Sequence, residues 1–120
     1  MLIDCHVHSV GNESVDDVIK AMDQAGVDKA IIFAPYPAAY GERKISLEPT
    51  KLGEFSYQGV NEEAQRKSTE FISNLQAEAS DRIIAFAWIE PRLKNAVQNV
   101  EEAVTKYECR GIKMIPDHWY

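Results

Sequence analysis

Two histidines near the start of the chain carry its strongest chemical signal. His6 and His8 are separated by one residue in the segment Asp4-Cys5-His6-Val7-His8. Side chains two positions apart on a β-strand point to the same side, so both imidazoles can reach one metal ion, with bonds of about 2.0–2.1 Å if it is zinc. The spacing predicts a pair of metal ligands, although two histidines on a solvated strand face would look the same.

Asp4 precedes His6 by two positions, and the same alternation predicts that its carboxylate lies on the side of the histidines. A carboxylate there could accept a hydrogen bond from an imidazole N–H and so fix which ring nitrogen is free for a metal. The opposite side of this strand, formed by Ile3, Cys5 and Val7, is apolar and is expected to pack beneath helices.

Lys113 interrupts the otherwise apolar segment 111–116, which reads Gly-Ile-Lys-Met-Ile-Pro. Facing inward, its ammonium would lose its water, and a buried ammonium is costly unless it is paired or neutral. Lys113 could pair with a carboxylate such as Asp4 or Glu90, contact a substrate or, once carboxylated, bridge two metal ions. The competing interpretation is that it extends into solvent at the edge of a sheet.

Other polar side chains are expected at the same end of the strands. Glu90 shares a face with Trp88 by strand alternation, and it is either a substrate contact or a loop carboxylate without a role. Asp117 and His118 follow the last strand and would lie at the same mouth, where His118 could bind a substrate, although a lone loop histidine is most often exposed. Four residues of the loop after the second strand could shape a pocket or anchor that loop: Tyr36, Tyr40, Arg43 and Tyr57.

Strand-like and helix-like segments alternate along the chain. We expect strands over 2–9, 29–34, 82–89 and 111–116, and helices over 14–25, 61–79 and 95–107. Ser14 to Asp17 has the form of a capping box, Gly26 ends the first helix, and Asn61 caps the second. The inward stripes of the later helices are predicted at Phe71, Leu75 and Ala79, and at Val97, Val100 and Val104. The alternation predicts an α/β domain with a parallel sheet and right-handed crossovers.

The chain has 120 residues, which allow one domain over 1–120, with a long loop over 35–60. The last expected strand is followed by only four residues, so no helix covers it. A closed (β/α)8 barrel needs about 250 residues. We therefore expect the first half of such a barrel, with the long loop at its mouth.

Composition excludes several classes of partner. Thirteen Lys and Arg against nineteen Asp and Glu leave a formal charge of −6, which argues against a nucleic acid or an anionic membrane as partner. The sequence shows no membrane-span pattern and no secretory pattern, so a cytoplasmic protein is expected. Cys5 and Cys109 are expected to be buried free thiols. The chain contains no glycine-rich phosphate loop, G-x-S-x-G or C-x-x-C.

The chain resembles the N-terminal half of the amidohydrolase superfamily, in particular the amidohydrolase-2 branch that includes aminocarboxymuconate-semialdehyde-decarboxylase-like enzymes. The first-strand pattern D-x-H-x-H, the helix-into-strand segment that follows it, the ending of the third strand and the fourth-strand G-x-K pattern carry the likeness. They lie at residues 3–8, 21–30, 89–91 and 111–116.

The resemblance implies a (β/α)8 barrel with one or two divalent ions, Zn2+ foremost, at the carboxyl ends of its strands. His6 and His8 would be the first two ligands, and later histidines and an aspartate beyond this chain would complete the site. Lys113 matches the position that is carboxylated in some members of the superfamily. The implied activity is hydrolysis of a C–N or C–O bond in a small molecule by metal-activated water, or non-oxidative decarboxylation.

Two other interpretations remain at this point. Phosphoesterases of the polymerase-and-histidinol-phosphatase family also begin with D-x-H-x-H-S, but they carry an Asp-His pair after the second strand, where this chain has Phe33 to Tyr36. Alternatively, the chain is a non-catalytic half-barrel that forms a homo-oligomer or associates through its open sheet edge, because an uncovered hydrophobic strand tends to associate.

Overall fold

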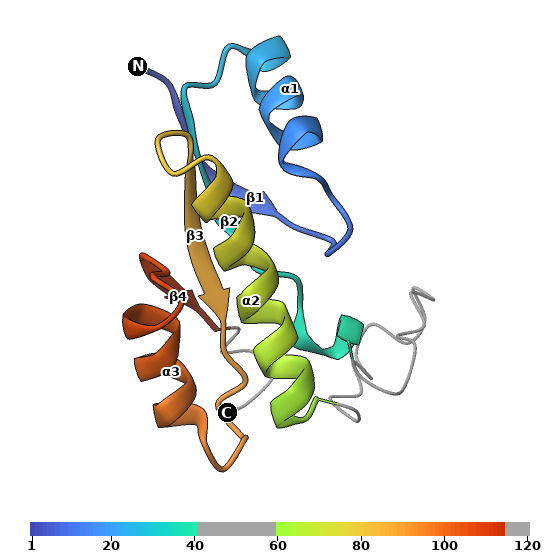
Figure 1. Cartoon of the computed structure of the whole chain (residues 1–120), viewed down its shortest axis with the longest axis vertical. Coiled ribbons are helices and arrows are strands. Elements are labelled where there is room, and N and C mark those ends of the chain that lie inside the picture. Colours follow the sequence, from blue (N-terminus) through green and yellow to red (C-terminus); the bar gives the residue numbers. More distant parts are fainter. Residues whose placement is uncertain (41–59, 115–120) are drawn as a thin grey trace.

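The computed structural model describes residues 1–40 and 60–114. These residues form one sheet of four parallel strands in chain order: β1 (Ile3–His8), β2 (Lys29–Phe33), β3 (Ile83–Trp88) and β4 (Gly111–Lys113). Between them lie α1 (Val15–Ala25), the short 3-10 helix η1 (Pro37–Tyr40), α2 (Glu62–Glu78) and α3 (Ala96–Thr105) (Figure 1). The expected α/β class is confirmed, with the alternating strand-helix order of a partial TIM-barrel-like architecture.

Local signals mark the helix ends as predicted. The Ser14 hydroxyl accepts a hydrogen bond from the Asp17 N–H at 3.2 Å, and Gly26 ends α1 with a φ of +69°. Asn61 Oδ1 accepts from the Ala64 N–H at 2.8 Å at the start of α2. Each such cap satisfies a backbone group that the helix itself leaves without a partner.

The two faces of the sheet differ in character. One face, here called the helix face, is covered by helices and holds the apolar core. Its buried strand residues include Ala30, Ile32, Ile83, Ala85, Ala87 and Ile89. The other face, here called the histidine face, carries His6, His8, Phe33, Phe86, Trp88 and Lys113, which contact one another through rings or the lysine ammonium. Alternation along each strand separates the two sets.

The predicted helix stripes are only partly right. In α2, Leu75 is buried but Phe71 and Ala79 are partly exposed, and much of the buried stripe is polar. That polar set is Gln65, Ser68, Thr69 and Gln76. In α3, Ala103 is the buried residue, whereas Val97 and Val104 are 76% and 51% exposed. A helical period shows which residues share a side, but the neighbouring elements decide which side is covered.

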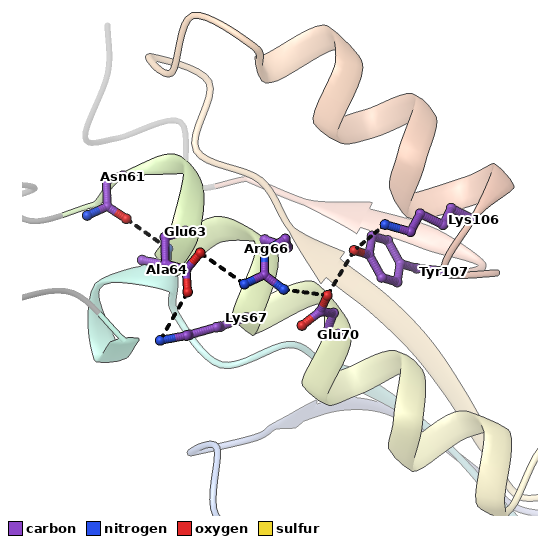
Figure 2. A network of polar contacts seen from close by, with 8 residues as sticks. All are labelled: Asn61, Glu63, Ala64, Arg66, Lys67, Glu70, Lys106 and Tyr107. Carbon is purple, nitrogen blue, oxygen red and sulfur yellow. Dashed lines mark hydrogen bonds and ion pairs between the residues drawn. The ribbon is translucent and has the colours of Figure 1, made fainter.

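The α2 and α3 helices are also joined on their outer side by polar contacts (Figure 2). Arg66 binds the carboxylates of Glu63 and Glu70, at 2.9 and 2.7 Å. The Tyr107 hydroxyl, just after α3, donates to Glu70 at 3.1 Å and lies 3.0 Å from the Lys106 ammonium. All of these groups are solvent-accessible, so each contact adds little to stability.

The cysteine prediction is right for Cys109 and wrong for Cys5. Cys109 is buried, and this burial raises the pKa of its thiol to about 11. Cys5 is exposed because β1 is an edge strand with few neighbours on either side. Within the described part of the chain, no helix is long and apolar enough to span a membrane.

Candidate metal centre

Strand β1 does not run in regular register with β2. Asp4 pairs with Ala30 and Val7 with Ile32, so Cys5 and His6 together face a single β2 residue. One extra residue in one strand is the defining feature of a β-bulge, which re-aims the side chains on either side of it. The bulge therefore lies inside the segment that carries the two histidines.

The bulge changes the position of Asp4. This residue pairs with Ala30 and, like Ala30, lines a cavity of about 300 Å³ between α1 and the sheet. Its carboxylate accepts a hydrogen bond from the backbone N–H of His6 at 3.0 Å, and not from an imidazole. The prediction that Asp4 shares a side with the histidines is wrong, because simple alternation assumes a strand without an extra residue. Asp4 instead binds the bulged backbone.

His6 and His8 converge as the sequence predicts. Their Nε2 atoms lie 2.9 Å apart, and the ring centroids are 4.9 Å apart. Both rings contact Phe33, at centroid distances of 4.8 and 5.3 Å, and His8 also contacts Trp88. Neighbouring aromatic rings on β2 and β3 therefore restrict both imidazoles.

Lys113 reaches the same place from the far end of the sheet. Its Nζ atom lies 3.5 Å from His6 Nε2. The ammonium also lies 4.3 Å from the centroid of the Phe33 ring and 5.5 Å from that of Trp88, which are cation–π distances. Of the two interpretations of Lys113, the structure favours the inward one, because the side chain lies across the histidine face, although the residue stays partly exposed. No ion pair with Asp4 or Glu90 is formed.

The pKa of His8 is lowered by its surroundings. Burial disfavours the charged imidazolium, and the nearby Lys113 and His6 add repulsion. A histidine must be neutral to offer a nitrogen lone pair to a metal ion, so this environment suits ligation.

Gly111 is a residue that the sequence reasoning did not single out. It pairs with Phe86, and a Cβ atom at this position would collide with the Phe86 ring. The absent side chain lets that ring lie across β4 and contact Phe33, with centroids 5.7 Å apart. A glycine that opens an apolar strand was the available signal.

Of the remaining predicted site residues, some lie near the histidine face and others do not. The Tyr36 ring contacts Trp88, with centroids 5.0 Å apart, so Tyr36 joins the aromatic side of the histidine face. Glu90 is 2% exposed and is part of a buried polar cluster, not a solvated loop. Tyr40 lies in η1, and its hydroxyl donates to the Gly11 carbonyl at 3.5 Å. Arg43, Tyr57, Asp117 and His118 lie outside the described residues.

The two histidines fit a shared divalent ion. Two bonds of about 2.0–2.1 Å can join nitrogens up to about 4 Å apart, and the observed separation is 2.9 Å. Within residues 1–40 and 60–114, however, no group of three or more His, Cys, Asp or Glu is arranged to hold a metal. The described part of the chain thus offers two protein ligands, one fewer than a catalytic zinc site normally has.

Comparison with solved structures finds the same fold in a larger enzyme. The chain superposes on the crystal structure of the 4-oxalomesaconate hydratase LigJ from Rhodopseudomonas palustris, with a TM-score of 0.65 and 16% sequence identity. The match covers 98% of this chain and 42% of the hydratase. At this identity the likeness shows the fold alone. No protein-family profile matches the chain, and no curated protein sequence is detectably similar.

Proposed function

We propose that this chain forms the N-terminal part of a metal-dependent hydrolase of the amidohydrolase-2 type. His6 and His8 would bind a divalent ion, with zinc as the first choice. One observation carries the proposal: the two Nε2 atoms lie 2.9 Å apart at the carboxyl end of β1. Barrel enzymes and open α/β enzymes have their active sites at this end of the strands. The remaining ligands would come from outside the described residues.

A bound divalent ion would lower the pKa of a water molecule and polarise a carbonyl group. The chain itself would hold the ion through neutral nitrogens and restrict their rings through contacts with Phe33. Lys113 would place a positive charge beside His6, where it attracts a carbonyl or carboxylate oxygen of a small-molecule substrate. Trp88 and Tyr36 would exclude water from the apolar part of that substrate.

Hydrolysis of a C–N or C–O bond, as in an amide or a lactone, is the reaction that this arrangement supports best. Non-oxidative decarboxylation is the second reaction that the family resemblance implies. Hydration of a small molecule is the third, because the superposed structure is that of a hydratase. All three are compatible with a polarising cation beside Lys113.

The proposal is tested by replacing both histidines in the full-length protein. His6→Ala with His8→Ala removes two ligands, so we expect bound metal and turnover to fall below one hundredth of the wild-type values. Metal content is measured by mass spectrometry after dialysis, and turnover with whichever amide, lactone or carboxylic acid the wild-type protein converts.

Cys5→Ser is the matched control, because Cys5 directly precedes His6 in the same strand and is exposed. This variant should keep its metal and its turnover. Full metal content and full activity in the double histidine variant would contradict the proposal. A wild-type protein that binds no metal and forms a stable oligomer would favour the non-catalytic half-barrel.

A further inference from the structure

Beyond Trp88, β3 keeps its extended pattern for two more residues. The Ile89 N–H donates to the Lys113 carbonyl at 3.0 Å on the β4 side. The Trp88 carbonyl and the Glu90 N–H point the other way, and both bond to Gln65, at 2.6 and 2.8 Å. Because backbone groups alternate in this way only in extended chain, Glu90 lies on the same side as Trp88, which is the histidine face.

Gln65 acts here as a substitute for a neighbouring strand. It lies on α2, is 1% exposed, and offers an acceptor and a donor to the end of β3 after the pairing with β2 has ended. The Thr69 hydroxyl lies 3.5 Å from the same amide nitrogen and donates to the Gln65 carbonyl at 3.1 Å. A glutamine so constrained holds the Glu90 backbone in one position.

The carboxylate of Glu90 is only half satisfied. Glu90 is 2% exposed, and its Oε1 accepts hydrogen bonds from the N–H and the Nε of Arg92, each at 3.0 Å. Its Oε2 is buried and accepts no hydrogen bond from any residue in 1–40 or 60–114. A buried acceptor without a donor costs free energy, and native proteins tolerate few of them unless they serve a function.

We propose that Oε2 of Glu90 accepts a hydrogen bond from an amide N–H of the substrate. This inference rests on the proposed function and narrows its substrate class to small amides. A carboxylate oxygen attracts a hydrogen-bond donor of the substrate and repels a substrate carboxylate. The site therefore discriminates against purely anionic substrates. Trp88 and Tyr36, on the same face, favour a flat or apolar group attached to the amide.

Benzamide and benzoate form a matched probe pair, because they have the same shape and differ in donor and charge. We measure their affinities for the full-length protein by titration calorimetry, with and without zinc. The wild-type protein should bind benzamide at least about tenfold more tightly than benzoate. Glu90→Gln should weaken benzamide binding by about tenfold or more and leave benzoate binding unchanged or stronger, as expected for a hydrogen bond to a charged acceptor.

Glu70→Gln is the control, since Glu70 is an ion-paired carboxylate on the outer side of α2. It should leave both affinities unchanged. Equal binding of the two probes by the wild-type protein, or equal benzamide binding by wild type and Glu90→Gln, would overturn the inference. If the metal proposal fails, the wild-type protein will not retain zinc. The benzamide and benzoate affinities measured without zinc test the role of Glu90 separately.

Unfolding in urea separates a binding role from a structural one. If Oε2 is reserved for a ligand, Glu90→Gln should unfold at the wild-type urea concentration or slightly above it, because a buried charge is removed. A lower midpoint together with unchanged benzamide affinity would assign Glu90 to the fold and reject the substrate role.

Discussion

The helices α1 and α2 cover the same sheet in different ways. Polar side chains on the buried side of α2 bind backbone groups of the sheet and its connections: Ser68 bonds to the Pro35 carbonyl, and Gln76 to Ala85 and Glu108. In α1, Met22 is the buried residue, and a cavity of about 300 Å³ lies beneath the helix. Figure 1 shows α1 standing apart from α2 beside β1.

Clear capping and periodicity signals in a helix do not by themselves produce tight packing against the sheet. Helix α1 has a capping serine, an acidic first turn and a glycine end, and its apolar stripe is easily recognised. It covers β1, and among residues 1–40 and 60–114 no strand pairs with the outer side of β1. Helix α2 has a partly polar buried stripe, yet it lies over β3, which has a neighbour on each side. Burial follows the position in the sheet more than the pattern in the helix.

The largest effect is expected when α2 loses a buried polar tether. Gln76 accepts from the Ala85 N–H at 2.7 Å and donates to the Glu108 carbonyl at 2.9 Å. Gln76→Leu would leave the buried Ala85 N–H without a partner and would remove the donor to the Glu108 carbonyl, at a cost of about 2 kcal/mol in the free energy of unfolding. Gln98→Leu is the control, because the side chain of Gln98 donates to the solvent-accessible carboxylate of Glu102 on the same helix. Equal losses in urea unfolding would contradict the tether role.

A smaller effect of opposite sign is expected at α1. Ala21 lines the cavity beneath this helix. Ala21→Leu would place apolar volume there and keep a good helix former, so the free energy of unfolding should rise by about 1 kcal/mol. Ala21 and Gln24 are both exposed, but Gln24 lies outside the cavity lining, so Gln24→Leu should change little. A loss of stability in Ala21→Leu would show that α1 packs as closely as α2.

The smallest effect concerns the loop that anchors α1. Burial of the Glu13 carboxylate opposes ionisation, but hydrogen bonds from the Val10 and Gly11 N–H groups and from the Ser9 hydroxyl outweigh it and lower the pKa. The unfolded chain therefore binds this proton more readily than the native protein. The stabilisation is complete above the ordinary glutamate pKa and is lost as the pH falls through the native value.

We expect the stability difference between wild type and Glu13→Gln to be largest at about pH 6 and to shrink toward about pH 3. Urea midpoints at both values measure it. Glu101→Gln, an exposed change on α3, should show no such trend. If wild type and Glu13→Gln differ in stability by the same amount at both pH values, ionisation of the Glu13 carboxylate does not stabilise this loop.

Much of the fold could be predicted because its signals are local. The apolar runs at 29–34 and 82–89 indicate covered strands, and the caps at Ser14 and Asn61 mark helix starts, since both depend on residues a few positions apart. The buried polar stripe of α2 could not be predicted. Gln65 is favourable inside the protein because the carboxyl end of β3 offers it two backbone partners 23 and 25 residues away.

The alternating element order and the histidine pair follow from short-range periodicity, so both can be read from the sequence alone. The position of Asp4 depends on the tertiary structure, since the extra residue in β1 is defined by its pairing with β2. The tertiary structure also brought Lys113 beside His6 across the sheet, over a separation of 107 residues. Strand register and side-chain burial depend on partners that are distant in sequence, and periodicity along one segment carries no information about them.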